Sequence, residues 1–306
     1  MVHSIDDQGE VFMAGVIRAA FFLLLCLLVC CTGGCGNNKE DTAKRVCKTS
    51  MFSWEEEYLL PDMEAEAGQA LETLGCEAVY QQIPEDTDID VIKDYLKRRR
   101  KAGQDVYCLA GDSKWAVQKN GEAMLRTVEI VGKWNKEARG DGGFCGIVWD
   151  VEPYLLMRWE TDPVTVMAQF VQNAVKAYRA AKEQDLLVIL CIPNFYDAVG
   201  MEESLEKLIQ SGCDAVAVMN YDKTDEAGQI SGEAELAAKY EKGIIHITEM
   251  QKPGTHELEP KNTYYQDGFE AVKKSWKHLR EEIPNENMGF SWHYLKPVLE
   301  LLRERE

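Results

Sequence analysis

Residues 186–192 read Leu-Leu-Val-Ile-Leu-Cys-Ile, an unbroken apolar run that ends at Pro193. A short run of this kind, with branched side chains, is typical of a strand buried on both faces, as in a parallel sheet covered by helices. Apolar residues recur with helical period before it, over 163–183, and after it, over 202–211. The stretch therefore predicts one strand between two helices.

The same alternation extends in both directions along the chain. Strands are predicted at 46–52, 77–82, 105–109, 145–150, 186–192, 215–220, 244–248 and 287–292. Helices are predicted at 62–74, 88–102, 115–137, 163–183, 202–211, 233–240, 264–280 and 295–303. Eight strands, each followed by a helix, within about 255 residues have the order and size of a TIM barrel. We therefore predict one (β/α)8 barrel domain over residues 46–306.

The chain is acidic, with 52 Asp and Glu against 34 Lys and Arg among 306 residues, for a formal net charge of −18. Nucleic acids and anionic lipid headgroups require clustered basic side chains. The basic run at 97–101 ends a predicted helix, where it offsets the negative helix terminus. The composition therefore argues against a nucleic-acid partner.

The first part of the chain has the pattern of a targeting segment. Residues 19–31 form an apolar run followed by Thr-Gly-Gly-Cys at 32–35. The run is shorter than the ~20 residues of a membrane-spanning helix but fits a secretory signal, and small residues before a Cys resemble the lipobox of bacterial lipoproteins. We predict a signal peptide at 1–35, lipidation of Cys35 and a tether at 36–45, which would anchor the barrel to the membrane at the bacterial cell surface. An uncleaved membrane anchor is the alternative.

Six cysteines follow the predicted lipidation site, at positions 47, 76, 108, 145, 191 and 213. Their wide spacing contains no metal-type C-x-x-C pair, and each lies at or near a predicted strand. A free Cys in such a place behaves as a small apolar side chain. Buried thiols are therefore the favoured interpretation, with disulfides as the alternative.

The carboxyl ends of the predicted strands are rich in carboxylates, amides and aromatic rings. In a TIM barrel, function gathers at these ends. The candidate contacts are Trp54, Gln82, Asp150, Glu152, Asn194, Tyr221, Asp222, Glu249 and Trp292. Flat aromatic faces and hydrogen-bonding groups suit a sugar ring, so we predict a glycan ligand. The five His have no metal-ligand spacing, and we predict no metal and no cofactor.

Asp150 and Glu152 form the clearest catalytic candidate. Residues two apart on a strand point to the same face, here the barrel interior or its mouth. Two close carboxylates repel each other when both are ionised, which raises the pKa of one of them. Glu152 can therefore stay protonated and donate a proton to a leaving oxygen.

Three segments resemble the family 18 glycoside hydrolases, the chitinases and endo-β-N-acetylglucosaminidases. Residues 146–152, Gly-Ile-Val-Trp-Asp-Val-Glu, are similar to the end of that family's fourth-strand motif, D-x-x-D-x-D-x-E. Residues 218–222, Val-Met-Asn-Tyr-Asp, are similar to its sixth-strand M-x-Y-D. Residues 288–292, Met-Gly-Phe-Ser-Trp, resemble the eighth strand that supplies a Trp beneath the sugar.

The resemblance implies hydrolysis of an N-acetylhexosamine glycan by a substrate-assisted retaining mechanism, in which the protein supplies no nucleophile. Glu152 would be the general acid/base. Asp150 would orient the acetamido group and stabilise an oxazolinium intermediate, and Tyr221 would hydrogen-bond the acetamido oxygen. Asp222 would contact the sugar, and Trp292 would stack under the ring.

The chain departs from the family motif at its first two acids, where Cys145 and Val148 stand. Loss of the inner Asp, at Val148, removes the partner that the family gives to the position of Asp150. The resemblance therefore implies a divergent branch of the family.

Two alternatives remain. Glu249, at the end of the seventh predicted strand, would be the nucleophile of a double-displacement glycosidase with Glu152 as acid, which requires carboxyl groups ~5 Å apart. A carbohydrate-binding surface lipoprotein without catalysis is the other, because Cys145 and Val148 replace motif acids. In each case we predict a monomer.

Overall fold

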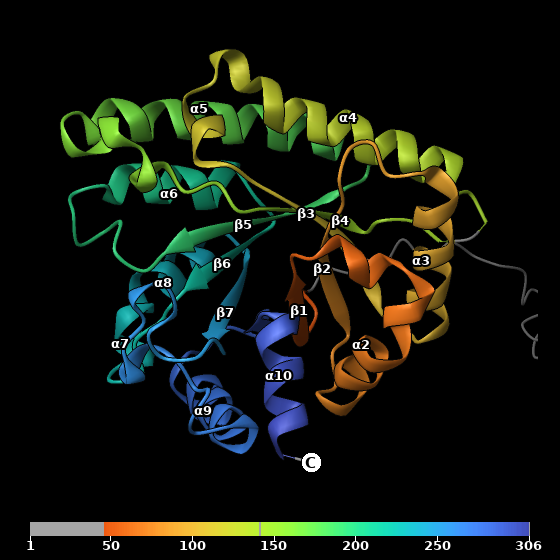
Figure 1. Ribbon diagram of the computed structural model, residues 1–306. Helices are drawn as coiled ribbons and strands as arrows, with labels where there is room; N and C mark the ends of the chain where they lie inside the picture. Colours follow the sequence, from red (N-terminus) through yellow and green to blue (C-terminus); the bar gives the residue numbers. More distant parts are fainter. Residues whose placement is uncertain (1–45, 141, 306) are drawn as a thin grey trace, which may run out of the picture. The chain divides into compact units, whose positions relative to one another are not determined.

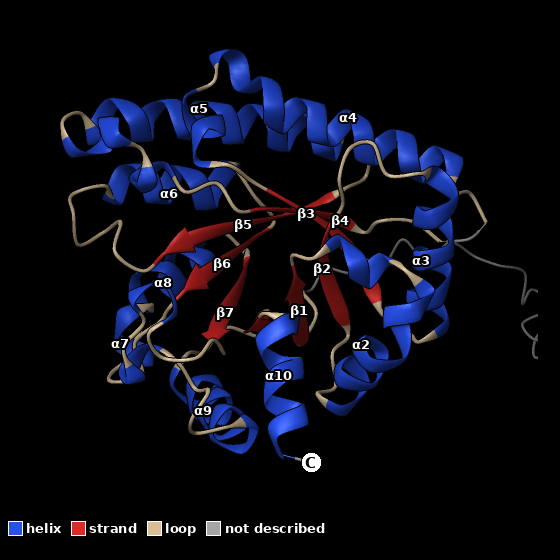
Figure 2. Ribbon diagram, viewed as in Figure 1, coloured by secondary structure: helices blue, strands red, loops and turns tan. Residues whose placement is uncertain are grey.

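The computed structural model describes residues 46–140 and 142–305, which build a closed barrel of eight parallel strands arranged in chain order. Figure 1 shows the chain passing from strand to helix around the barrel, and Figure 2 shows the helices forming a ring outside the strands. The predicted (β/α)8 TIM barrel is confirmed. Functional residues are therefore sought at the carboxyl ends of its strands.

Each predicted strand overlaps one observed strand. The strands are β1 (Thr49–Ser53), β2 (Ala78–Gln82), β3 (Asp105–Ala110), β4 (Gly146–Trp149), β5 (Leu187–Pro193), β6 (Ala215–Met219), β7 (Gly243–Glu249) and β8 (Met288–His293). The barrel closes because β8 pairs with β1, with Ser50 beside Ser291. All strands run in the same direction, so their carboxyl ends meet at one mouth.

Helices connect the strands, and several short 3-10 turns precede them. The α-helices are α2 (Pro61–Thr73), α3 (Ile89–Lys101), α4 (Glu122–Glu137), α5 (Pro163–Lys182), α6 (Glu202–Ser211), α7 (Glu226–Gln229), α8 (Ser231–Lys239), α9 (Phe269–Glu282) and α10 (Leu295–Arg305). The 3-10 turns are η1 (Glu56–Leu59), η2 (Ser113–Val117), η3 (Lys119–Gly121), η4 (Pro153–Leu155), η5 (Met157–Glu160), η6 (Thr255–Glu257) and η7 (Pro260–Asn262).

Two helices begin later than predicted. The helix expected over 115–137 starts at Glu122, because Asn120 and Gly121 have φ of 62° and 69°, in the left-handed region that a right-handed helix cannot include. The helix expected from 264 starts after Gly268, whose φ is 81°. The short helix α7 was not predicted, since four residues are too few for a visible period.

Strand side chains alternate between two apolar layers. Phe52, Tyr80 and Val148 belong to the cluster that fills the barrel interior. Met51 and Trp149 belong to the larger cluster between the strands and the helices. Successive side chains of a strand point to opposite faces. Every second residue therefore points into the barrel interior, and the residues between them point toward the helices.

The six cysteines beyond position 45 are free thiols in the structure, and those at 76, 108, 191 and 213 are buried. The favoured interpretation as buried thiols is confirmed for these four, and those at 47 and 145 are partly buried. Among the residues that the structure describes, no helix is both long and apolar enough to cross a bilayer. The predicted signal at 1–35, lipidation of Cys35 and tether at 36–45 lie outside the described residues.

Candidate active site

An open cleft of about 480 Å³ lies at the carboxyl ends of β4, β5 and β6. Residues from all three strand ends line it, among them Glu152, Tyr154, Asn194, Phe195, Tyr221 and Asp222. Four of the predicted site residues, Glu152, Asn194, Tyr221 and Asp222, are therefore brought together. Carboxylate, amide and aromatic groups face one space, as a sugar site requires.

Asp150 follows the last residue of β4 and is held there by its backbone. Its N–H donates to the carbonyl of Ala110 at the end of β3, at 3.0 Å. The next residue along that strand end, Gly111, approaches so closely that a Cβ on it would lie 1.8 Å from the carbonyl oxygen of Asp150. The absence of a side chain at Gly111 is what permits the β3 and β4 ends to pack beside each other.

Burial and the nearby Glu152 raise the pKa of Asp150 to about 7, although His293 and the thiol of Cys191 act in the opposite direction. One oxygen of its carboxyl, Oδ1, is buried and accepts no hydrogen bond. Burial is the larger cause of this rise and the charge of Glu152 is the second. The carboxyl whose pKa rises is thus Asp150, whereas the sequence pattern led us to expect that Glu152 would be the one to stay protonated.

The Glu152 carboxylate accepts a hydrogen bond from the hydroxyl of Tyr154. The Tyr154 ring packs edge-on against Phe195, with centroids 5.2 Å apart, and against Tyr196 at 6.4 Å. Burial, followed by the charge of Glu152, holds the pKa of the Tyr154 hydroxyl far above its usual range, so that it stays a donor. Tyr154 was not among the predicted site residues, because no sequence pattern ties its ring to Glu152.

Tyr221 and Asp222 follow β6. Burial, then the charges of Glu249 and Asp150, hold the pKa of the Tyr221 hydroxyl well above its ordinary value, so it too remains a hydrogen-bond donor. Asp222 accepts hydrogen bonds from the backbone N–H and the hydroxyl of Thr224, at 2.9 and 2.6 Å. These bonds lower the pKa of Asp222, which is therefore an anion at neutral pH.

Asn194, after β5, is oriented by a chain of amides. Its side-chain N–H₂ donates to Asn220 Oδ1 at 3.1 Å, and Asn220 in turn donates to the carbonyl of Glu226 at 2.8 Å. Asn220 is buried. Its partners fix the amide of Asn194 at the edge of the cleft.

Glu249 ends β7 and lies beneath the cleft surface. One of its oxygens accepts the backbone N–H groups of Met250 and Gln251, at 2.8 and 2.7 Å. The other lies 2.8 Å from Nδ1 of His293 and accepts the Gln251 side chain at 3.1 Å. Burial alone would raise the pKa of Glu249, but His293 and Gln251 together hold it below its ordinary value. Glu249 is thus held by His293 and Gln251 and is not among the residues that line the cleft.

Trp292 does not reach the cleft, and the prediction that it stacks under a sugar is wrong. Its side chain is fully buried on the outer side of β8. There it packs against Trp276 and Phe269 of α9, with ring centroids 4.5 and 5.7 Å away. The next residue, His293, points inward, and its ring stacks on Tyr221 at 5.8 Å.

The two remaining predicted contacts lie farther along the mouth. Trp54, just beyond β1, is partly buried and stacks on Phe52 of the barrel interior, with centroids 6.3 Å apart. Gln82 is exposed and borders a different cavity, together with Trp115 and Trp134. Trp54 is therefore placed at the mouth, whereas Gln82 is not part of the cleft.

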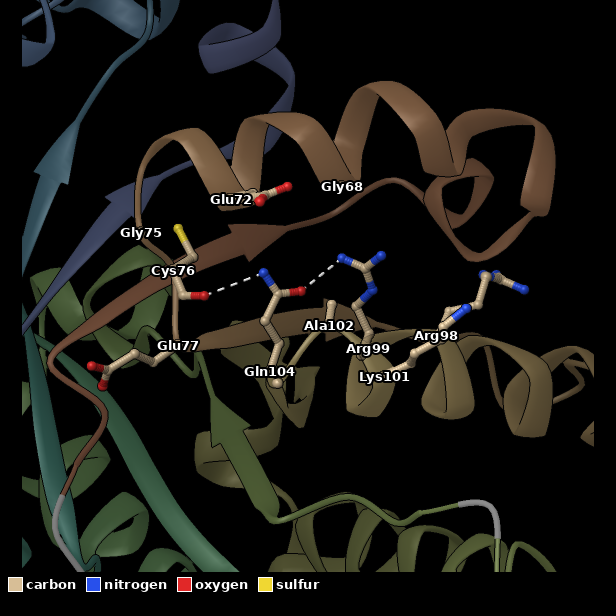
Figure 3. A pocket seen from close by; sticks show the side chains of 11 residues that line it. Gly68, Glu72, Gly75, Cys76, Glu77, Arg98, Arg99, Lys101, Ala102 and Gln104 are labelled. Atoms are coloured by element: carbon tan, nitrogen blue, oxygen red, sulfur yellow. Dashed lines mark hydrogen bonds between the residues drawn. The ribbon is translucent and has the colours of Figure 1, made fainter.

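A larger cavity, of about 670 Å³, lies between α2 and α3 at the opposite end of the barrel. Figure 3 shows Arg99 donating to Gln104, which donates to the carbonyl of Cys76. Cys76 lies two residues before β2 and Gln104 directly precedes β3, so this cavity is at the amino-terminal ends of the strands. We therefore do not take this cavity as the active site, because the active sites of TIM barrels lie at the carboxyl ends of the strands.

No group of His, Cys, Asp or Glu among the described residues is arranged to hold a metal ion. The cleft instead brings together a proton donor or acceptor, Glu152, and a phenol, Tyr221, and a second carboxyl, Asp150, lies at the end of β4, where the charge of Glu152 acts on it. Such a set can protonate a leaving oxygen and stabilise a developing positive charge.

No protein-family model matches the sequence, and a search of curated proteins finds no match. Solved structures do resemble it. A GH18 chitinase from Cycas revoluta in complex with (GlcNAc)4 has a TM-score of 0.55 at 11% identity, over 84% of this chain and 97% of its own. A chitinase from Chromobacterium violaceum has a TM-score of 0.52 at 14% identity, over 85% of this chain and 98% of its own. A putative alpha-L-fucosidase from Bacteroides thetaiotaomicron has a TM-score of 0.57 at 13% identity, over 85% of this chain and 92% of its own. At these identities the similarity establishes the shared barrel fold.

Proposed function

We propose that the protein is a glycoside hydrolase that cleaves an N-acetylhexosamine glycan by a substrate-assisted retaining mechanism. The observation that carries the proposal is the placement of Glu152 and Tyr221 in one cleft, next to the end of β4, where Asp150 lies. The chitinase fold of the structural neighbours, one of them in complex with (GlcNAc)4, supports the same class of substrate.

In this mechanism Glu152 donates its proton to the glycosidic oxygen as the bond to C1 breaks. The acetamido oxygen of the same sugar attacks C1 and forms an oxazolinium ring. The Asp150 carboxylate stabilises the positive charge at the acetamido nitrogen, and Tyr221 donates a hydrogen bond to the acetamido oxygen. Water then attacks C1, giving its proton to the Glu152 carboxylate, which restores the acid and yields retained configuration.

The double-displacement alternative finds less support. A nucleophile needs a free carboxylate oxygen facing C1. Both oxygens of Glu249 are already engaged, by two backbone N–H groups and by Gln251 and His293, and its side chain is only 2% exposed. Glu249 is an anion that supports its neighbour, and the substrate's own acetamido group is the better nucleophile.

The test is turnover of chitooligosaccharides, N-glycans and peptidoglycan fragments by the full-length protein and by Glu152→Gln. We expect the substitution to lower kcat by roughly three orders of magnitude or more, because the proton donor is lost. Glu160→Gln is the matched control, since Glu160 is exposed in the same loop after β4. Glycan binding without turnover in the unsubstituted protein would identify a carbohydrate-binding protein instead.

We propose further that the protein is lipid-anchored at the bacterial cell surface through Cys35 and acts there as a monomer. The apolar run at 19–31 and the small residues before Cys35 support this localisation. Incorporation of labelled palmitate should be lost in Cys35→Ser and retained in Cys31→Ser. Labelling that is lost only in Cys31→Ser would identify Cys31 as the lipidated residue instead.

A further inference from the structure

The hydroxyl of Tyr154 is the one hydrogen-bond partner that Glu152 has among the residues that the structure describes. It donates to Oε2 of the Glu152 carboxylate. Both side chains line the cleft beyond the carboxyl end of β4. The contact therefore reaches the group that the proposed reaction uses as its proton donor.

The local sequence explains how Tyr154 comes to lie beside Glu152. The backbone N–H of Leu155 donates to the carbonyl of Glu152 at 3.1 Å, which closes a turn over residues 152–155. Pro153 occupies the second position of this turn, where its ring fixes φ at the value that the turn requires. Tyr154 is the third residue, so the chain turns back and brings its side chain to that of Glu152.

Aromatic side chains from the next loop hold the Tyr154 ring. Phe195 and Tyr196, which follow β5, meet it edge-on, with ring centroids 5.2 and 6.4 Å away. Tyr196 is itself fully buried, and Trp159 packs against it with centroids 6.0 Å apart. A ring that is locked by packing presents its hydroxyl at one place, as a group that orients a catalytic side chain has to do.

The hydrogen bond makes the two oxygens of the Glu152 carboxyl unequal. Oε2 accepts the Tyr154 hydroxyl, whereas Oε1 has no hydrogen-bond partner in the described part of the chain. A protonated carboxyl carries its proton on one oxygen and keeps the other as an acceptor. Because Oε2 is already engaged as an acceptor, the proton belongs on Oε1, which is the oxygen left for a ligand in the cleft.

We propose that Tyr154 is a positioning residue for the proton donor: its hydroxyl binds Oε2 of Glu152 and so assigns Oε1 to the glycosidic oxygen. In the first step the Oε1–H bond breaks as the proton passes to the leaving oxygen, and the electron pair stays on the carboxylate. In the second step Oε1 takes a proton from the attacking water, which restores the carboxyl. Tyr154 keeps its own proton throughout. The inference rests on the proposed function, in which Glu152 is both acid and base.

The role predicts a dependence on the leaving group. A proton donor matters most for a poor leaving group, such as the sugar hydroxyl of a chitooligosaccharide, and little for a dinitrophenolate, which leaves without a proton. We expect Tyr154→Phe to lower kcat/KM for a chitooligosaccharide by roughly 10- to 100-fold, as for loss of a hydrogen bond to a charged group. The kcat/KM for a dinitrophenyl N-acetylglucosaminide should fall by less than about threefold. A merely structural role would lower both alike.

The experiment uses the full-length protein, Tyr154→Phe, Glu152→Gln, the double variant and Tyr240→Phe, each checked for folding by circular dichroism. Tyr240 is the matched control, because its hydroxyl also donates to a glutamate, Glu206, while it caps the end of α8 and does not line the cleft. Its substitution should leave kcat/KM for both substrates unchanged. If Tyr154 acts through Glu152, adding Tyr154→Phe to Glu152→Gln produces no further loss.

A loss that is much larger for the chitooligosaccharide than for the dinitrophenyl substrate, and that disappears in the Glu152→Gln background, supports the positioning role. Equal losses for the two substrates, no loss, or an undiminished loss in the double variant overturns it and leaves the proposed function standing. If the unsubstituted protein turns over neither substrate, or if Glu152→Gln is as active as it, the proposed function fails and the positioning role fails with it.

Discussion

The barrel contains two Glu–His pairs that differ in the side of the strand on which they lie. His246 and Glu249 both belong to β7, three residues apart, so their side chains point to opposite sides of the strand. His246 faces the helices, where it is fully buried and lies 3.4 Å from Glu226. Glu249 faces the barrel interior, where it meets His293, which is 17% exposed.

The surroundings of the two pairs also differ. Glu226 also accepts hydrogen bonds from Tyr264, at 3.0 Å, and from Ser275. This outer pair is enclosed by protein, with the His246 side chain fully buried and the Glu226 side chain 10% exposed. The same two residue types thus form a packing element between the strands and the helices in the Glu226–His246 pair. In the Glu249–His293 pair they lie at the mouth of the barrel. Position relative to the sheet, and not residue type, decides between the two.

The largest effect is expected for Glu226→Ala. It leaves the hydroxyls of Tyr264 and Ser275 without the carboxylate to which they donate, and each donor left without an acceptor costs about 1 to 3 kcal/mol of unfolding free energy. Urea unfolding measures the loss. The kcat/KM of the folded protein for a chitooligosaccharide should stay the same, and a large fall in kcat/KM would break the distinction between the pairs.

Glu233 on α8 sharpens the comparison, because it is a buried carboxyl without a His. Both of its oxygens lack a hydrogen-bond partner, and burial raises its pKa from 4.5 to about 7. The native state therefore favours the protonated form, and stability is lost as the pH rises from 4.5 through 7.

Glu233→Gln removes this penalty, and we expect a gain of about 3 kcal/mol at pH 8 with little change at pH 4. Unfolding free energies measured by urea at the two pH values provide the check. An equal gain at both would mean that ionisation of Glu233 is not the cause.

The smallest effect is expected for Trp292→Phe. It tests whether neighbouring residues of β8 have different roles because they lie on opposite sides of the strand, as the two Glu–His pairs do for β7. Trp292 packs against α9, so a smaller ring should cost about 1 to 3 kcal/mol of stability. KM for a chitooligosaccharide should stay the same. A several-fold rise in KM without loss of stability would indicate that Trp292 contacts the substrate in the cleft.

Most of the fold could be predicted from the sequence, because its signals are local. The run at 186–192 identifies β5 through apolar residues alone, and its repetition gives the eight units. The helical spacing over 115–137 hides the delayed start of α4, although the Asn120-Gly121 dipeptide is itself a turn signal and both residues adopt left-handed φ.

The site was predicted in part. Strand period predicts that Asp150 and Glu152 share a face. Both follow the end of β4 at Trp149, Glu152 lines the cleft, and its charge acts on Asp150. Trp292 was misplaced because the family resemblance, and not the strand period, assigned it to the cleft, whereas its side chain lies on the outer face of β8. The contact between Glu249 and His293 joins residues 44 positions apart, and only the pairing of β7 with β8 reveals it.

The central claim is that the substrate's acetamido oxygen is the nucleophile, positioned by Asp150 and Tyr221. The most direct measurement is kcat/KM for aryl N-acetylhexosaminides whose acetyl group carries zero, one, two or three fluorine atoms. Each fluorine withdraws electrons from the acetamido oxygen and makes it a poorer nucleophile. The account predicts a steep fall in kcat/KM with each fluorine, and rates that do not depend on fluorine content would contradict it.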